Sequence, residues 1–237
     1  MKKILKYSLT LLLLICAGAF EGVVSQALAE DVRQTIATSY GIDQFNQVEQ
    51  IQYTFNVKFG DKGVNRFWIW EPKVDKVTFK AGNSEEYITY NRKEINDTTS
   101  EKIKKIDAWF INDNYWLLFP YRVAWDSHVK VEDIGSHALP MGGGNAKCVV
   151  VTFPSSGGYT PGDVYELFLD NEYKLTHWVY RRGASPQPTR IATWEDYRHV
   201  GPLTLSLTHQ GEDKNFRLWF TNVGVKMAGA TGWMIAN

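Results

Sequence analysis

The chain has 237 residues, of which 44% are hydrophobic and 22% are charged, and it contains nine Trp, twelve Tyr and twelve Phe. This composition excludes a disordered, collagenous or coiled-coil protein and suffices for a large hydrophobic core. The 26 basic and 26 acidic residues give a net charge of zero. Such a balance argues against a nucleic-acid partner or an anionic membrane surface, because either would need a basic excess or a basic stripe.

The first 29 residues have the features of a secretory signal peptide. Three lysines occur within the first six residues, an uncharged stretch covers residues 7–20, and the segment ends in Ala-Leu-Ala at residues 27–29. An uncharged stretch of this length is shorter than the ~20 residues that a membrane-spanning helix needs. We therefore expect export to the periplasm or cell envelope, with cleavage after Ala29.

Cleavage at this site would leave residues 30–237 as a single domain. Removing 29 residues from 237 leaves 208, and removing three lysines and one glutamate leaves 23 basic and 25 acidic residues, a net charge of −2. The alternative is a lipid-modified precursor with Cys16 at the end of its apolar run, although the bulky Leu14 and Ile15 disfavour it. After cleavage only Cys148 would remain, so no internal disulfide is expected, and its Val-rich neighbourhood favours a buried small hydrophobe.

The first half of this domain is predicted to begin with a helix and continue as antiparallel strands. Apolar residues at four-residue steps predict a helix over residues 31–40, and strict alternation predicts a half-buried strand over residues 51–59. A second helix is expected over residues 100–110, with Ser100 as its N-cap. Three further strands are predicted between them, over residues 66–70, 76–80 and 86–92.

The second half is predicted to consist of strands with short connections, which favours an antiparallel meander. These strands cover residues 128–132, 147–153, 164–169, 175–181, 190–199, 203–209 and 216–225. About eleven strands are too many for one flat sheet. The expected fold is therefore α+β and mostly β: a strongly curved antiparallel sheet, or half-open barrel, with helices covering its concave face. Such a shape can enclose an apolar cavity.

Two segments carry a resemblance to a known family. Residues 40–51, YGIDQFNQVEQI, form the predicted transition from helix to first strand, and residues 108–121 read AWFINDNYWLLFPY. Together with the order of elements over residues 31–226, they resemble the LolA/LolB-like lipoprotein-carrier superfamily, in an uncharacterised exported branch. The resemblance implies a half-barrel lidded by helices, acyl chains as cargo and envelope lipoproteins as partners.

Large apolar side chains are the candidates for a ligand-binding cavity, because an acyl chain needs wide apolar walls with few polar groups. Both faces of the strand at residues 66–70 are apolar, and residues 115–121 form an apolar cluster that could act as a lid. We assign the cavity and lid to Tyr53, Phe55, Val57, Trp68, Trp70, Trp109, Tyr115, Trp116, Phe119, Trp178 and Tyr180. The alternative is that these side chains, the 115–121 cluster included, pack as ordinary core.

Sequence motifs for catalysis are absent: the chain contains no H-E-x-x-H, G-x-S-x-G or Walker loop. Its five histidines lack metal-ligand spacing and are expected to be solvated or at the edge of the core. We therefore expect a monomer without catalytic residues, metal or cofactor that binds a hydrophobic small molecule or acyl chain. Two alternatives stay open: a structural or protein-interaction module with a filled core, and a hydrolase whose site comes from residues distant in sequence.

Overall fold

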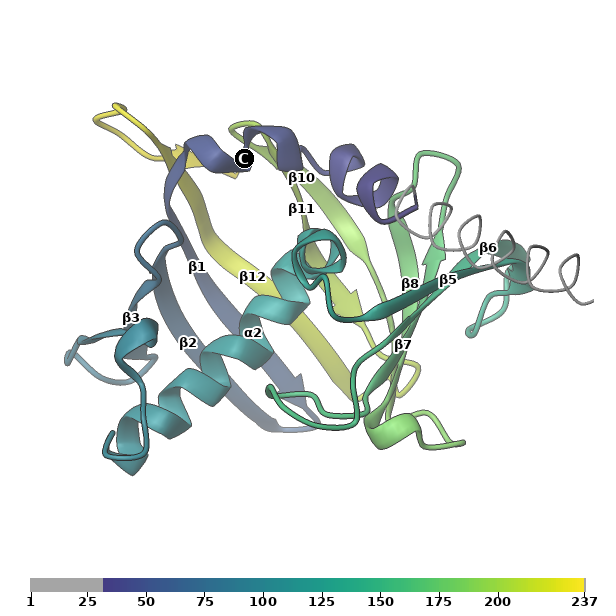
Figure 1. The fold of residues 1–237 in the computed structure, drawn as a ribbon, viewed down its shortest axis with the longest axis horizontal. Helices are drawn as coiled ribbons and strands as arrows, with labels where there is room; N and C mark the ends of the chain where they lie inside the picture. Colours follow the sequence, from purple (N-terminus) through teal and green to yellow (C-terminus); the bar gives the residue numbers. More distant parts are fainter. Residues whose placement is uncertain (1–31, 237) are drawn as a thin grey trace, which may run out of the picture.

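The computed structural model describes residues 32–236. The predicted leader, with Cys16 and the Ala29 cleavage site, lies outside this part. The described chain is mostly antiparallel β-strand with a few helices (Figure 1), which confirms the α+β, mostly β class. None of its helices combines the length and the apolar character needed to cross a membrane.

The strands form two antiparallel sheets. The first has the order β10-β11-β12-β1-β2-β3-β4, with β13 beside β12, and the second has the order β5-β6-β7-β8-β9. The strands are β1 (Val48–Phe59), β2 (Lys62–Glu71), β3 (Lys76–Ala81), β4 (Ile88–Asn91), β5 (Lys130–Ala138), β6 (Asn145–Thr152), β7 (Val164–Leu169), β8 (Leu175–Arg181), β9 (Arg190–Thr193), β10 (Glu195–Val200), β11 (Leu203–Gln210), β12 (Phe216–Met227) and β13 (Met234–Ile235).

The two sheets meet at β9. Ala192 of β9 forms an isolated bridge with Gly211. The strand predicted over residues 190–199 is divided at Trp194, because its two halves pair in different sheets and Asp196 adopts a left-handed φ of 53°. The strands thus pair as two sheets and not as one sheet of about eleven strands, and the half-open barrel stays a prediction.

A short helix opens the described chain, as predicted, and covers residues 32–39. Gly41 separates it from the 3-10 helix η1 (Ile42–Gln47) and adopts a φ of 91°. A Cβ atom at this glycine would lie 2.2 Å from the Pro202 carbonyl oxygen, so no other residue fits here without a shift of the backbone. Two more 3-10 turns, η2 (Arg92–Glu94) and η3 (Arg182–Ala184), follow β4 and β8.

Helix α2 (Glu101–Trp125) crosses the face of the first sheet and reaches the second (Figure 1). Ser100 caps it, as predicted, by accepting a hydrogen bond from the Ile103 amide. The helix is longer than the predicted residues 100–110, because it continues past Pro120 with a distortion at Leu118 (φ −117°). A proline inside a helix costs about 3 kcal/mol. Burial of the surrounding apolar side chains between the sheets offsets this cost.

Candidate functional site

A cavity of about 620 Å³ lies at the junction of the two sheets. Strands β1, β2 and β12 form one wall, β7 to β9 a second, helix α2 a third, and the loop of residues 153–163 a fourth. A volume of this size falls within the range of small-molecule binding cavities, roughly 300–1,000 Å³. The geometry therefore has room for a ligand beside the packed core.

Aromatic rings form much of the cavity wall. The Trp116 ring centroid lies 4.4 Å from that of Trp178 and 5.9 Å from that of Phe216. Phe55 and Leu218, on β1 and β12, are buried and line the same space. Each ring presents a large apolar area without a hydrogen-bonding requirement, so this wall suits an apolar chain more than a polar group.

Charged side chains also reach the cavity: three arginines and one aspartate, namely Arg66, Arg182, Arg190 and Asp163. Arg66 forms a bidentate ion pair with Asp113, with Nε–Oδ2 and Nη2–Oδ1 distances of 2.7 and 2.6 Å. Asp163 accepts hydrogen bonds from the Tyr180 hydroxyl (2.9 Å) and the Gly183 amide (2.8 Å). Arg66 and Asp163 are thus satisfied within the protein.

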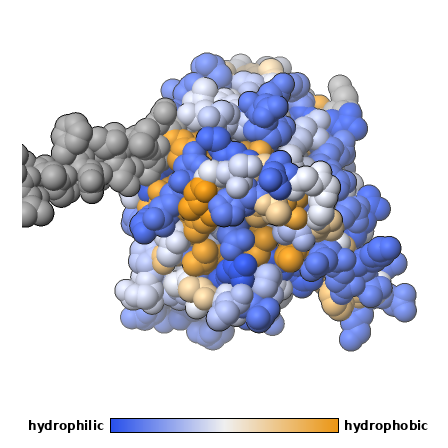
Figure 2. Space-filling model, turned by 90° about the vertical axis from the view of Figure 1, so that its right-hand side faces the viewer, coloured by the Kyte–Doolittle hydropathy of each residue, from blue (hydrophilic) through white to orange (hydrophobic). Residues whose placement is uncertain are grey.

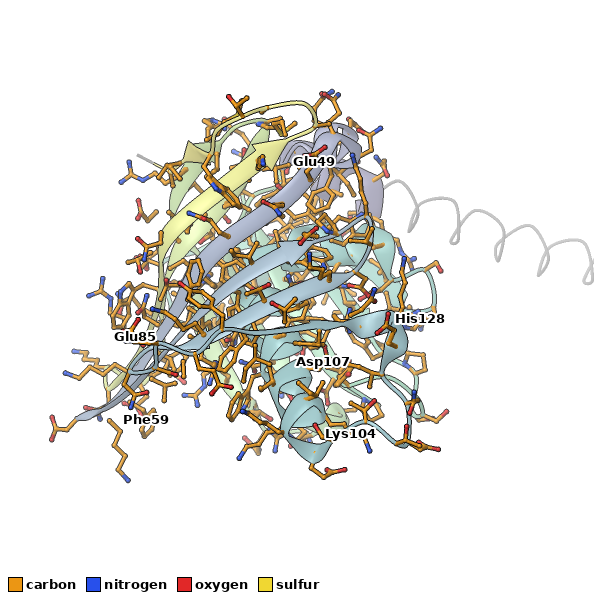
Figure 3. All side chains as sticks on the ribbon, turned by 90° about the vertical axis from the view of Figure 1, so that its left-hand side faces the viewer. Glu49, Phe59, Glu85, Lys104, Asp107 and His128 are labelled. Atoms are coloured by element: carbon orange, nitrogen blue, oxygen red, sulfur yellow. The ribbon has the colours of Figure 1, made fainter. Side chains whose placement is uncertain are left out.

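Buried polar side chains hold α2 against the first sheet. Asp113 also accepts a hydrogen bond from Trp68 Nε1 at 2.9 Å, while Asp107 accepts from the Tyr90 hydroxyl (3.0 Å) and Arg92 Nε (2.8 Å). Both carboxylates are fully buried, and Figure 3 shows Asp107 on the helix behind the strands. Burial raises the pKa of Asp113, and the hydrogen bonds from Arg66 oppose that rise.

The loop of residues 153–163 contacts α2 through Tyr159 and through Phe153, whose ring centroid lies 6.2 Å from that of Tyr115. Tyr159 is half exposed, lines the cavity and donates its hydroxyl hydrogen bond to Asp107. Gly157, Gly158 and Gly162 adopt positive φ angles of 82°, 69° and 71°, which give the loop its tight turns. The loop therefore forms a cavity wall, and the Tyr159–Asp107 hydrogen bond helps to hold it against the helix.

Two smaller cavities flank α2. One, of about 430 Å³, lies beside Phe45, Trp70 and Trp125, and another, of about 330 Å³, lies between α2 and the 153–163 loop. Arg122 lines both cavities, donates to the Asn114 side chain at 2.8 Å and stacks on Trp125.

Six of the eleven predicted site residues line the 620 Å³ cavity: Phe55, Val57, Tyr115, Trp116, Trp178 and Tyr180. Trp70 lines the 430 Å³ cavity instead. Tyr53, Trp68, Trp109 and Phe119 lie outside the large cavity; the ring centroid of Trp68, for example, lies 5.5 Å from that of Phe110 on α2. Residues 117–121 belong to α2 and are buried, so this part of the 115–121 cluster packs the helix onto the sheets. That packing is the alternative that the sequence left open.

The charged residues of the site were not predicted from the sequence, although the positions of Arg66 and Asp113 indicated that both side chains face the core. Arg66 alternates with Trp68 and Trp70 and therefore shares their face of β2, which points at the helix. Asp113 follows Phe110 by three residues and so falls on the buried face of α2. A polar residue on a buried face indicates a paired charge or a site.

His209 corrects the expectation that the histidines are solvated or at the edge of the core. It is fully buried on β11 and packed against the rings of Trp116 and Trp194. Its Nδ1 lies 3.0 Å from the Thr193 carbonyl oxygen, and the Trp116 backbone lies close to the same ring. Burial lowers the pKa of His209 from its ordinary 6.5 to about 3. The ring is therefore neutral in the folded protein.

We predict that His209 makes the fold sensitive to acid. In the unfolded chain His209 takes up a proton below about pH 6.5, whereas in the folded chain it stays neutral down to its lowered pKa. The contribution of the neutral His209 to the free energy of unfolding is therefore complete above this pH and is lost as the pH falls towards the folded pKa. Between pH 7 and pH 5 this group should lower the free energy of unfolding by about 2 kcal/mol. Urea unfolding at both pH values should show that His209→Gln removes this difference and that His137→Gln, at an exposed position, does not. An unchanged pH dependence in His209→Gln would contradict the prediction.

Cys148 is buried, as predicted, beside Phe168 and Val179 in a second apolar cluster on the five-stranded sheet. Figure 2 views the side of the molecule on which this sheet lies and shows hydrophobic residues surrounded by hydrophilic ones. Burial raises the pKa of the Cys148 thiol to about 12, so it stays protonated at neutral pH. Within residues 32–236, no group of three or more His, Cys, Asp or Glu side chains is arranged to hold a metal ion.

Comparisons with known proteins leave the family open. No family model matches the chain, and no curated protein matches it. A DUF1329 family protein from Desulfovibrio piger has a similar solved structure, with a TM-score of 0.46 and 6% sequence identity over 86% of this chain and 95% of that chain. At this score the likeness carries no argument about function.

Proposed function

We propose that this protein binds and carries a hydrophobic ligand, a lipid or an acyl chain, in the 620 Å³ cavity. The observation that carries the proposal is the aromatic wall of Trp116, Trp178 and Phe216, which borders a cavity at the junction of the sheets. The protein would act by sequestering its ligand, not by catalysis. It would do so as a monomer in the periplasm or cell envelope, after cleavage behind Ala29. The resemblance to LolA/LolB-like carriers agrees with this proposal, in which the two sheets serve as one half-open barrel.

Burial of a chain in this cavity supplies enough free energy for useful affinity. Each buried methylene contributes about 0.8 kcal/mol, so ten of them give a gross gain of about 8 kcal/mol, which corresponds to a dissociation constant of roughly 1 μM. Loss of ligand freedom reduces this gain. We therefore expect micromolar or weaker binding from the apolar wall alone.

Titration of residues 30–237 with a fluorescent fatty acid tests this function. We expect saturable binding at one site, with a blue-shifted emission from the apolar surroundings and displacement by an unlabelled fatty acid of the same length. A protein that is folded by circular dichroism but takes up no probe would overturn the proposal. That result would favour the structural or protein-interaction module.

The loop of residues 153–163 is predicted to limit the release of the ligand. Tyr159→Phe keeps the ring but removes the hydroxyl that bonds to Asp107. We expect about three- to tenfold faster release of the fluorescent fatty acid in stopped-flow experiments, since a typical hydrogen bond contributes about 0.5–1.5 kcal/mol. Tyr87→Phe, at an exposed tyrosine away from the cavity, is the control. An equal release rate in Tyr159→Phe and the wild type would exclude this role of the loop.

A further inference from the structure

We propose that the ligand is a single-chain amphiphile with an acidic head group, a carboxylate or a phosphate, and that Arg190 binds this head group with help from Arg182. This inference rests on the proposed function and specifies the substrate class of the same cavity. The apolar tail would lie against the aromatic wall, and the head group would stay at the rim.

Arg190 is a cation at the cavity that stacks on aromatic rings. It is the first residue of β9, and its guanidinium carbon lies 4.3 Å from the ring centroid of Phe216, which lines the cavity. Its guanidinium forms no hydrogen bond or ion pair with any residue in the described range 32–236. Stacking occupies one face of the guanidinium plane and leaves the N–H donors at its edge available for an anion.

Four of the nine arginines in residues 32–236 form an ion pair with a carboxylate; Arg190 does not, and Arg217 on β12 is likewise stacked on a ring without such a pair. Arg66 pairs with Asp113, Arg92 pairs with Asp107, and Arg181 pairs with Glu166 at 2.7 Å. Arg182, which also lines the cavity, makes only a 3.4 Å contact from Nε to the Tyr180 hydroxyl and no ion pair among the described residues. Of the arginines that line the cavity, Arg182 and Arg190 are thus the two without a carboxylate ion pair among the described residues.

The charge balance of the cavity favours an anion. Of the three lining arginines, Arg66 is neutralised by Asp113, and Asp163 is the carboxylate among the lining residues. Asp163 offsets one of the two remaining positive charges, so an excess of one remains. A carboxylate or phosphate would offset this excess and accept bidentate hydrogen bonds from a guanidinium.

The position of Arg190 suits a head group that remains in contact with water. Its guanidinium carbon also lies 5.8 Å from the ring centroid of Phe59, which is exposed at the end of the β1–β2 hairpin (Figure 3). Arg190 is itself half-buried. An anion at this rim would keep part of its hydration, whereas a charge deep among the rings of Trp116 and Trp178 would pay a large desolvation cost.

Binding of three amphiphiles with the same twelve-carbon chain tests the proposal: dodecanoic acid, dodecyl phosphate and dodecanol, each measured by displacement of the fluorescent probe. We expect the two acids to bind at least tenfold more tightly than the alcohol. Arg190→Gln should reduce this preference about tenfold and leave dodecanol binding unchanged, and Arg182→Gln should have a smaller effect. A preference between the acids would distinguish a carboxylate from a phosphate head group.

Arg217→Gln is the matched control, because Arg217 is exposed on β12, with its guanidinium carbon 5.0 Å from the Trp219 ring centroid, and does not line the cavity. Equal affinity for the alcohol and both acids would overturn the head-group proposal while leaving the proposed function intact. An equal loss of affinity for all three ligands in a folded Arg190→Gln variant would also overturn the head-group proposal, since Arg190 would then only support the cavity wall. Absence of binding by all three ligands would contradict the proposed function itself.

Discussion

Replacing Asp113 with alanine is expected to lower the free energy of unfolding by about 3–5 kcal/mol, because removing one partner of a buried ion pair leaves the other charge uncompensated. Asp113 is fully buried and accepts hydrogen bonds from Arg66 and Trp68. Without this carboxylate, the largely buried Arg66 guanidinium would lose its ion-pair partner and the Trp68 indole N–H would lose its hydrogen-bond acceptor. Helix α2 would then lose a main polar attachment to β2.

Urea unfolding of Asp113→Ala and of the double variant Arg66→Met/Asp113→Leu measures this effect. The double variant should regain most of the loss, because replacing both charges with apolar groups removes the unpaired charge. Arg198→Ala, which breaks the exposed pair with Asp196, should cost less than about 1 kcal/mol. A loss below about 1 kcal/mol in Asp113→Ala would show that the ion pair does not hold the helix.

Replacing Ala108 with tryptophan is expected to weaken probe binding at least tenfold without unfolding the protein. Ala108 is exposed on α2 and lines the cavity, so an indole at this position would occupy space that the ligand needs. The helix should tolerate the change, since tryptophan is less favourable than alanine by only a few tenths of a kcal/mol up to about 0.7 kcal/mol in a helix.

Lys102→Trp provides the control for this variant, because it adds the same side chain to an exposed position of α2 that does not line the cavity. Both variants should unfold at similar urea concentrations, and only Ala108→Trp should bind the fluorescent fatty acid at least tenfold more weakly than the wild type. Wild-type affinity in Ala108→Trp would place the ligand elsewhere.

The spacing of apolar residues predicted those strands that bury one face against the core and expose the other to solvent. The alternation over residues 51–59 located β1, observed as Val48–Phe59, because a half-buried antiparallel strand exposes every second side chain. The same alternation placed Phe55 and Val57 on one face, and both line the large cavity.

Features that depend on distant partners were not predictable in this way. The alternation over residues 190–199 gives no sign that the strand divides at Trp194, since the division arises from pairing in two different sheets. The predicted helix end at residue 110 was too early, because burial of α2 keeps the helix continuous through Pro120. Arg66 and Asp113 are 47 positions apart in the sequence, so their pairing became visible only when β2 and α2 were placed together.

Native mass spectrometry of the protein purified from its own host without detergent shows directly whether a ligand occupies the cavity. We expect a reproducible lipid-sized mass adduct on the wild-type protein that organic extraction releases and that Ala108→Trp lacks. A folded wild-type protein that carries no adduct, and still carries none after incubation with fatty acids, would contradict the proposal that this protein binds a hydrophobic ligand.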